Sequence, residues 1–155
     1  MASFSHLRAV ADSDLALFFD QQQEPEATQM AAFPARDRPT FMAHWAKILA
    51  DPLCITQTIV ADDEVAGNIG SWLQDGERDV GYWLGRAYWG QGIATQALTA
   101  FLAQLPERPL YAYVVRHNIG SRRVLEKCGF TVCAADPQAT HAGADDVEEI
   151  RLILT

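Results

Sequence analysis

The 155-residue sequence predicts an α/β domain built on a mixed sheet with helices on both faces. Three observations lead to this fold class. Strand-like apolar segments come first in a block of three and then alternate with helical segments. Asp75-Gly76 is typical of a tight turn between antiparallel strands. A glycine loop joins one strand directly to a helix, as in many α/β phosphate sites. No composition shift or internal repeat divides the chain, so we expect residues 1–155 to form one domain.

The first third of the chain predicts one strand and two helices. Leu7–Val10 is a short apolar run, and residues 12–14 supply N-cap side chains for the helix that follows. Gln21–Pro39 is polar and interrupted by prolines, so we expect a loop with at most one helical turn around Ala27–Ala32. Asp37 begins the second helix. Its apolar stripe has helical spacing and consists of Phe41, Trp45, Ile48 and Leu49.

The rest of the chain predicts three consecutive strands and then alternating helices and strands. The consecutive strands are Cys54–Ala61, Val65–Gln74 and Asp79–Leu84. In the second of them, Gly67 and Gly70 indicate a bulge or close packing. A helix begins at Gly92, and a later one is capped by Asn118 and closed by Gly129. The remaining strands are Leu110–Val115, Phe130–Ala134 and Asp146–Leu154, with a polar loop at Asp136–Asp145.

Composition and charge exclude several classes of protein. The net charge of −8 disfavours nucleic-acid binding and weakly favours a cationic substrate. No apolar run approaches the roughly 18 residues that span a bilayer, and Met1–Val10 lacks the features of a signal peptide. We therefore expect a cytoplasmic protein without membrane contact. The three cysteines and four histidines are scattered, which predicts neither a disulfide framework nor a metal site.

Basic residues nevertheless gather in one part of this acidic chain. The cluster consists of Arg108, Arg116, Arg122, Arg123 and Lys127. Two interpretations remain open from the sequence, a solvated face or a basic patch beside a phosphate site.

The stretch Tyr82–Thr95 carries the strongest functional signal. Gly90 and Gly92 lack a Cβ, so the backbone can turn tightly and a ligand can come close to it. The helix that starts there offers unpaired N–H groups and the positive end of its dipole. Together these features predict a site for an anion, most often a phosphate.

Three kinds of phosphate loop contain glycines at a comparable spacing. A Walker loop requires Lys-Ser/Thr after its last glycine, where this chain has Gln91-Gly92. A dinucleotide loop requires a third glycine, where this chain has Thr95, and an acidic residue after the next strand, where it has Arg116. The pattern [Q/R]-x-x-G-x-[G/A] fits except at its first position, which is Trp89. The spacing alone favours the third kind without excluding an unrelated nucleotide-binding loop.

Two segments of the chain together resemble the GNAT acetyltransferase superfamily. They are Gly81-Tyr-Trp-Leu-Gly-Arg-Ala-Tyr-Trp-Gly-Gln-Gly-Ile-Ala-Thr95 and Asn118-Ile-Gly-Ser-Arg-Arg-Val-Leu-Glu-Lys-Cys-Gly-Phe130. The branch that they resemble includes the ribosomal-protein N-terminal acetyltransferases. The resemblance is specific over Val80–Phe130, and earlier in the chain only the order of elements matches. It implies a mostly antiparallel sheet of about seven strands with a central parallel pair, Asp79–Leu84 and Leu110–Val115, that splays apart.

The resemblance implies that acetyl-CoA is the co-substrate. Backbone groups of Leu84, Gly85 and Arg86 would meet the pantetheine and the thioester. The N–H groups of Gly90, Gln91, Gly92, Ile93, Ala94 and Thr95 would hold the pyrophosphate. Asn118 would bond the pantetheine arm, although it also reads as a plain N-cap. Arg123 or Lys127 would meet the phosphates.

The resemblance also suggests two catalytic residues. Asp79 stands where many family members keep a glutamate base, and the competing interpretation is a solvated strand end beside Arg78. Many members carry a tyrosine seven residues after the asparagine to protonate the leaving thiolate, whereas this chain has Leu125. We expect Ser121 to replace that tyrosine, and the competing interpretation is an ordinary residue in the first turn of a helix.

These observations predict an N-acetyltransferase that transfers an acetyl group directly to a primary amine, on a protein N-terminus or a small molecule. The alternative is an acyl-CoA-binding sensor or partner module without turnover. We expect the acceptor pocket to include His44 and Trp45, together with the Gln21–Pro39 loop and the loop between the last strands, although His44 also reads as a structural residue. We expect a monomer or a homodimer.

Overall fold

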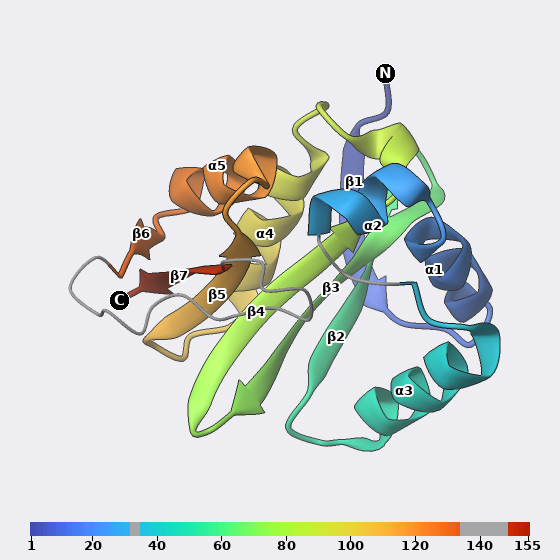
Figure 1. Ribbon diagram of the computed structural model, residues 1–155, viewed down its shortest axis with the longest axis horizontal. Coiled ribbons are helices and arrows are strands. Elements are labelled where there is room, and N and C mark those ends of the chain that lie inside the picture. The colour runs from blue at the N-terminus through green and yellow to red at the C-terminus, as the bar shows by residue number, and fades with distance from the viewer. Residues whose placement is uncertain (32–34, 134–148) are drawn as a thin grey trace.

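The computed structural model describes residues 1–31, 35–133 and 149–155. Its strands form one mixed sheet in the order β1-β2-β3-β4-β5-β7-β6 (Figure 1). Every neighbouring pair is antiparallel except β4 and β5, which are parallel. The strands are β1 (Phe4–Ala9), β2 (Ile55–Ala61), β3 (Glu64–Gln74), β4 (Glu77–Leu84), β5 (Leu110–Val115), β6 (Thr131–Val132) and β7 (Glu149–Leu154). The predicted fold class and the central parallel pair are confirmed.

The described helices cover both faces of this sheet (Figure 1). One face carries α1 (Asp14–Gln22), α2 (Pro25–Ala31) and α3 (Arg38–Ala50), and the other carries α4 (Ile93–Gln104) and α5 (Ile119–Lys127). A single 3₁₀ turn, η1 (Arg86–Tyr88), follows β4. No helix of the described residues is long and apolar enough to cross a membrane.

The sequence reading was wrong about part of the Gln21–Pro39 segment. The first helix runs to Gln22, and a second, α2, occupies Pro25–Ala31. Pro25 is the first residue of α2, a position where the missing N–H costs nothing and the fixed φ suits a helix. Proline therefore starts a helix here instead of interrupting one. Residues 32–34 lie outside the described part of the chain.

The apolar side chains form two groups on the two faces of the sheet. The main core lies between the sheet and the helices α4 and α5, and Phe101, Leu98 and Leu152 are among its most buried members. A smaller group around Phe18, Phe41 and Trp45 joins α1 to α3. It is aromatic, with the ring centroids of Phe18 and Trp45 5.2 Å apart. Leu49 was wrongly placed in the buried stripe of α3, since its side chain is exposed.

The two central strands separate soon after they meet. β4 stays paired with β3 along its whole length, from Glu77 opposite Gln74 to Leu84 opposite Gly67. In contrast, β4 and β5 pair at a single position, Asp79 opposite Tyr111. The strands therefore splay apart beyond Asp79, toward their carboxyl ends, as predicted.

Glycine allows β3 to follow β4 so closely. A Cβ on Gly67 would stand 2.1 Å from the carbonyl oxygen of Trp83, which no side chain permits. The register between β2 and β3 also shifts between Ile59 and Val60, so a bulge lies beside this glycine. The structure therefore confirms both predicted features of this strand, the bulge and the close packing at Gly67.

Candidate active site

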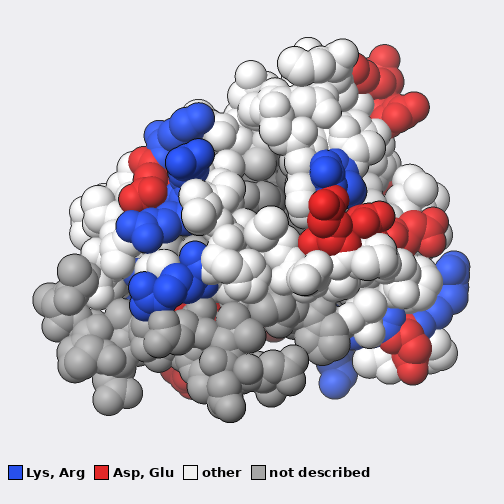
Figure 2. All heavy atoms as spheres, turned by 45° about the horizontal axis from the view of Figure 1, so that its top comes forward, with Lys and Arg blue, Asp and Glu red and all other residues white. Residues whose placement is uncertain are grey.

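A cavity of about 490 Å³ opens where β4 and β5 have separated. Its walls come from the end of β4, the loop before α4, the first turn of α4, one side of α5 and helix α2. Figure 2 shows the surface hollowed at this place, with Lys and Arg side chains gathered beside the hollow. Two of these basic residues, Arg123 and Lys127, line the cavity.

The cavity brings together most of the residues predicted for cofactor binding. Those that line it are Leu84, Gly90, Gly92, Ile93, Ala94, Thr95, Asn118, Ser121 and Arg123. Six predicted site residues do not line it, namely His44, Trp45, Asp79, Gly85, Arg86 and Gln91. The loop before α4 and the start of α5 thus form one site, although they are more than twenty residues apart in the sequence.

The glycine loop has the shape of an anion cradle. Gly90 and Gly92 have φ angles of +72° and +78°, in the left-handed region that favours glycine. No atom lies within 4 Å of the place where a Cβ would stand on either glycine, so the space in front of the backbone is open. Gly92 is the N-cap of α4, and its carbonyl accepts the first helical bond, from Gln96 N at 3.1 Å. The N–H groups of the first turn have no partner within the helix, and they fit a pyrophosphate group.

Side chains hold this loop against the end of β4. The indole Nε1 of Trp89 donates to the carbonyl of Leu84 at 2.9 Å, and the Arg86 guanidinium lies over the Trp89 ring at 4.7 Å. Arg86 also pairs with Glu26 of α2. Gln91 donates to Ala87 O at 2.9 Å and accepts from Ala2 N at 2.7 Å. Arg86 and Gln91 therefore support the loop through their side chains.

The backbone of Gly85 is not available as the sequence suggested. Its N–H donates to Ala66 O at 2.8 Å, and its carbonyl accepts from Tyr88 N at 2.9 Å. Because backbone groups alternate in direction along an antiparallel strand, the N–H groups of Leu84 and Tyr82 point away from β3, toward the opening between β4 and β5. The N–H groups of Tyr82 and Leu84 are thus the donors that face the opening, and that of Leu84 lies nearer the glycine loop.

Asn118 and Ser121 form the first turn of α5. Asn118 Oδ1 accepts from Ser121 N at 3.2 Å, so the N-cap role is confirmed and the side-chain NH₂ group takes no part in the cap. The Ser121 hydroxyl accepts a hydrogen bond from the Tyr82 hydroxyl at 3.2 Å. Burial raises the pKa of the Tyr82 phenol above its ordinary value. Leu125, by contrast, is buried in the main core.

Asp79 is a buried carboxylate at the point where the strands separate. Its side chain is 1% exposed, and Oδ1 has no hydrogen-bond partner among the described residues. Burial first, and then the charge of Glu77, raise its pKa to about 6. Arg78 instead contacts Leu53 O at 2.6 Å and Glu107 at 3.2 Å. A solvated strand end beside Arg78 therefore does not describe this residue.

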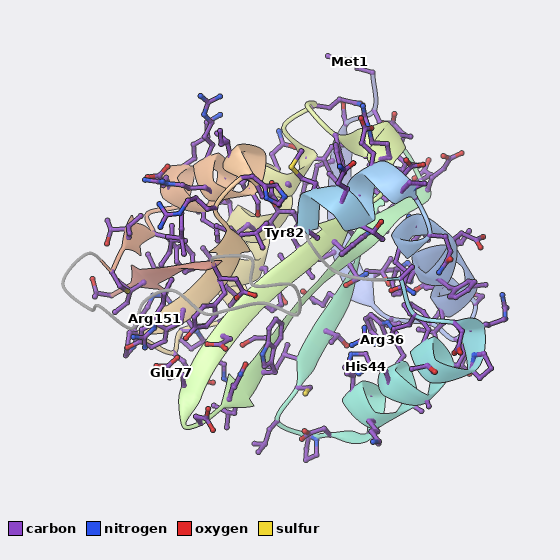
Figure 3. The ribbon with its side chains drawn as sticks, viewed as in Figure 1. Met1, Arg36, His44, Glu77, Tyr82 and Arg151 are labelled. Carbon is purple, nitrogen blue, oxygen red and sulfur yellow. The ribbon has the colours of Figure 1, made fainter. Side chains whose placement is uncertain are left out.

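Asp79 and Tyr82 lie on opposite faces of β4, because side chains alternate along a strand. Figure 3 shows Tyr82 between α2 and α5, and Glu77 beside Arg151 at the other end of β4. Glu77 pairs with Arg151 and accepts from the Tyr113 hydroxyl at 3.1 Å. The cavity reaches both faces of the sheet, because Tyr82 and Trp83 point to opposite faces and both line it, whereas the two carboxylates lie nearer the start of β4.

The two residues proposed for the acceptor pocket lie apart from the cavity. Trp45 is 6% exposed and packs in the aromatic group between α1 and α3. His44 is exposed on α3, and partial desolvation and the charges of Arg36 and Lys47 lower the pKa of its imidazole. Their role in an acceptor pocket stays a prediction, and the burial of Trp45 favours a packing role.

The predicted basic cluster divides into residues that reach the cavity and residues that do not. Arg123 and Lys127 line the cavity. Arg122 forms an i,i+4 ion pair with Glu126 at 3.6 Å, and Arg108 donates to the carbonyls of Leu105 and Glu107, both at 2.7 Å. Two members of the cluster, one turn apart on α5, thus lie at the cavity, and a phosphate site beside them stays a prediction.

Several lining residues were missed as site residues from the sequence. They are Ala27, Met30, Ala31, Tyr82, Trp83, Tyr88, Trp89, Gly120 and Val124. The signal for Tyr82 was its alternation with Val80 and Leu84, which places it on the core side of β4. Ala27, Met30 and Ala31 belong to the Gln21–Pro39 segment, which we expected to contribute to the acceptor pocket as a loop, and the structure places them on helix α2. Among the described residues no group of three or more His, Cys, Asp or Glu side chains could hold a metal ion, and Cys54 and Cys128 form no disulfide.

Comparison with known proteins adds a family and a fold. The family model described as an acetyltransferase (GNAT) domain matches residues 6–131. No curated protein matches the sequence. The solved structures with a similar fold include an acetyltransferase from Agrobacterium tumefaciens (23% identity, 100% of this chain and 92% of that chain, TM-score 0.79). They also include RimL, a ribosomal L7/L12 α-N-protein acetyltransferase in complex with coenzyme A (19%, 95% and 90%, 0.74). A third is spermidine N-acetyltransferase from Vibrio cholerae in complex with CoA and spermine (13%, 96% and 93%, 0.79).

Proposed function

The chain belongs to the GNAT acetyltransferase family and uses acetyl-CoA, and from this premise we propose that it transfers the acetyl group directly to a primary amine on a small molecule or a peptide N-terminus. One observation carries the proposal. A single paired position, Asp79 opposite Tyr111, lies below the open cavity and keeps a buried carboxylate at the point where the two strands separate.

The donor side of the site is built from the loop and α5. Acetyl-CoA supplies an acyl group that is activated as a thioester. The N–H groups of Gly90–Thr95 hold its pyrophosphate, and Arg123 and Lys127 add positive charge beside it. Asn118 donates from its side-chain NH₂ group to the pantetheine arm. Leu84 N–H polarises the thioester carbonyl, since the N–H of Gly85 is already bonded to Ala66.

The acceptor side of the site lies on the other face of β4. Asp79 receives the proton that the amine must lose before or during attack. It lies three residues before Tyr82, roughly 10 Å along the strand, so the proton reaches it through water. The raised pKa of about 6 makes Asp79 a stronger base than an exposed aspartate and still leaves it mostly ionised at neutral pH. Holding the amine beside the thioester supplies most of the rate.

Ser121 completes the site on the side of the leaving sulphur. Its hydroxyl lines the cavity and belongs to the first turn of α5, close to the positive end of that helix. It donates to the sulphur as the acetyl group leaves. Support for this role comes from Leu125, whose apolar side chain is buried in the core and offers no proton.

The acceptor is proposed only as a class. RimL and the spermidine enzyme share this fold, and their names state a ribosomal protein and a polyamine as acceptors. Their common chemistry is a primary amine. The net charge of −8 favours acceptors that are cationic.

A thiol-release assay tests the proposal. The protein is mixed with acetyl-CoA and with a panel of polyamines, amino sugars and peptides that have free N-termini, and free CoA thiol is followed over time. Thiol release that depends on one class of amine, together with the acetylated product by mass, supports the proposal. Tight CoA binding without amine-dependent release from any member of the panel contradicts it.

A further inference from the structure

The hydroxyl of Tyr82 meets Ser121 inside the wall of the cavity. Tyr82 extends from β4 and donates to Ser121 Oγ on α5, with 3.2 Å between the two oxygens. Both side chains line the cavity. Figure 3 shows Tyr82 between α2 and α5. The contact therefore joins the strand that borders the opening to the helix that carries the proposed donor.

The ring of Tyr82 contributes packing, and its hydroxyl contributes a hydrogen bond. The ring packs against the main core, and a phenylalanine ring would pack there equally well. The hydroxyl adds the bond to Ser121. Burial disfavours the phenolate and so raises the pKa of this phenol, which keeps its proton and stays a hydrogen-bond donor.

Ser121 is held from two sides. Its backbone N–H is bound by Asn118 Oδ1 at 3.2 Å, and its hydroxyl oxygen accepts from Tyr82 at the same distance. A serine hydroxyl has one proton and two lone pairs. Because Tyr82 occupies a lone pair, the proton of Ser121 is left to donate elsewhere in the cavity.

We propose that Tyr82 is a positioning residue that directs the hydroxyl proton of Ser121 toward the sulphur of bound CoA and so stabilises the negative charge of the leaving thiolate. This inference rests on the proposed function. Many family members place a tyrosine at the position of Leu125, and here a tyrosine hydroxyl reaches the site from β4 instead. Ser121 donates to the sulphur that keeps the electron pair of the broken C–S bond, and Asp79 receives the proton of the amine nitrogen that bonds to the acetyl carbon. Tyr82 keeps its own proton, and water then protonates the thiolate and deprotonates Asp79.

The CoA complex provides a test that needs no turnover. The fraction of bound CoA present as thiolate is measured at one pH by ultraviolet difference absorbance, for the unmodified protein and for Tyr82→Phe, Ser121→Ala and the double variant. We expect the thiolate fraction to fall about tenfold in each single variant, as for the loss of a hydrogen bond to a charged group. The double variant falls no further than Ser121→Ala, because Tyr82 acts through Ser121.

Two further measurements separate positioning from packing. Tyr82→Phe lowers kcat about tenfold and leaves KM for acetyl-CoA and the free energy of unfolding unchanged. Tyr113→Phe is the matched control, because its hydroxyl donates to Glu77 at 3.1 Å on the opposite face of the sheet; the thiolate fraction stays unchanged in this variant.

The outcomes of the test are distinct. CoA binding with the same thiolate fraction in Tyr82→Phe as in the unmodified protein overturns the inference and leaves the proposed function intact. The inference is also overturned if Tyr82→Phe lowers the thiolate fraction of bound CoA as much in the Ser121→Ala variant as in the unmodified protein. Tyr82 would then act without Ser121. Failure of the unmodified protein to bind CoA overturns the proposed function itself.

Discussion

Asp79 is a carboxylate kept out of water beside another carboxylate. Its side chain is 1% exposed, and burial and the charge of Glu77 raise its pKa to about 6. A group that must accept a proton works only when it is ionised. We therefore expect kcat/KM for the amine to rise as the pH increases through about 6.

Replacement of Asp79 by asparagine tests this role. Asp79→Asn removes the proton acceptor and keeps the shape, so kcat falls by about 100-fold or more and the rise near pH 6 disappears. Glu77→Gln is the matched change. It removes the neighbouring negative charge, lowers the pKa of Asp79 and moves the rise to lower pH. Rates are measured from about pH 5 to about pH 9, and an unchanged pH profile in Asp79→Asn would exclude the role.

Gly92 tests the loop at the scale of one residue. Valine there is strained by the φ of +78°, and its side chain would stand in the open space in front of the loop. Gly76→Val carries the same strain at φ +80°, with equally open surroundings, in the turn between β3 and β4. Each variant loses about 1–3 kcal/mol of stability. Only Gly92→Val weakens CoA binding by about 100-fold or more, as measured by calorimetry. Equal CoA affinities in the two variants would contradict the assignment of this loop as the pyrophosphate site.

At the scale of one element, α5 depends on Asn118 for its start and, in our proposal, for a contact with acetyl-CoA. Serine caps a helix as well as asparagine, whereas alanine does not. Asn118→Ser therefore keeps the stability, and Asn118→Ala loses about 1 kcal/mol in the free energy of unfolding. Both lack the side-chain NH₂ group and bind CoA about fivefold more weakly. If Asn118→Ser bound CoA normally, the contact would be excluded and the cap would be the whole role.

Elements differ in how far neighbouring residues predict them. The strand Leu110–Val115 and the helix capped by Asn118 were predicted at the observed bounds, because apolar periodicity and capping side chains are local. Helix α2 was missed because its seven residues carry little periodicity and begin with Pro25. Its small face lines the cavity through Ala27, Met30 and Ala31, which only the packing of α2 over the ends of the strands determines.

At the scale of the whole molecule, two buried aspartates give opposite pH dependences. Asp14 ties α1 to β1 and β2, since it accepts from Arg8 at 2.7 and 3.0 Å and from the Thr58 hydroxyl at 2.7 Å. These bonds, with that from Arg8 the strongest, lower its pKa to about 2 from 3.8. Its stabilisation is complete above pH 3.8 and is lost as the pH falls through about 2. The pKa of Asp79 is raised instead, so its contribution is complete below pH 3.8 and is lost as the pH rises through about 6.

Unfolding by urea at several pH values checks this balance. Asp79→Asn is more stable than the unmodified protein by roughly 2–3 kcal/mol at neutral pH and gains nothing near pH 4. Asp14→Asn is less stable by roughly 1–2 kcal/mol near pH 5, a value reduced because the Arg8 side chain is 37% exposed. That difference disappears toward pH 2. Parallel pH curves for the unmodified protein and either variant would contradict the assignment for that residue.

The sequence by itself determined the order of the described strands and of every described α-helix except α2, together with the glycine loop and the start of α5. Each of these rests on residues close together in the chain, where missing Cβ atoms, capping oxygens and apolar periodicity act directly. The tertiary structure alone decided that Gly85 N–H is taken by Ala66, that Asp79 is buried and that Tyr82 reaches Ser121 across 39 residues. Those contacts depend on the register of β3 with β4 and on the divergence of β5, which no neighbouring residue specifies. Residues close together in the sequence thus determine the glycine loop, and the long-range pairing of strands determines which groups surround it.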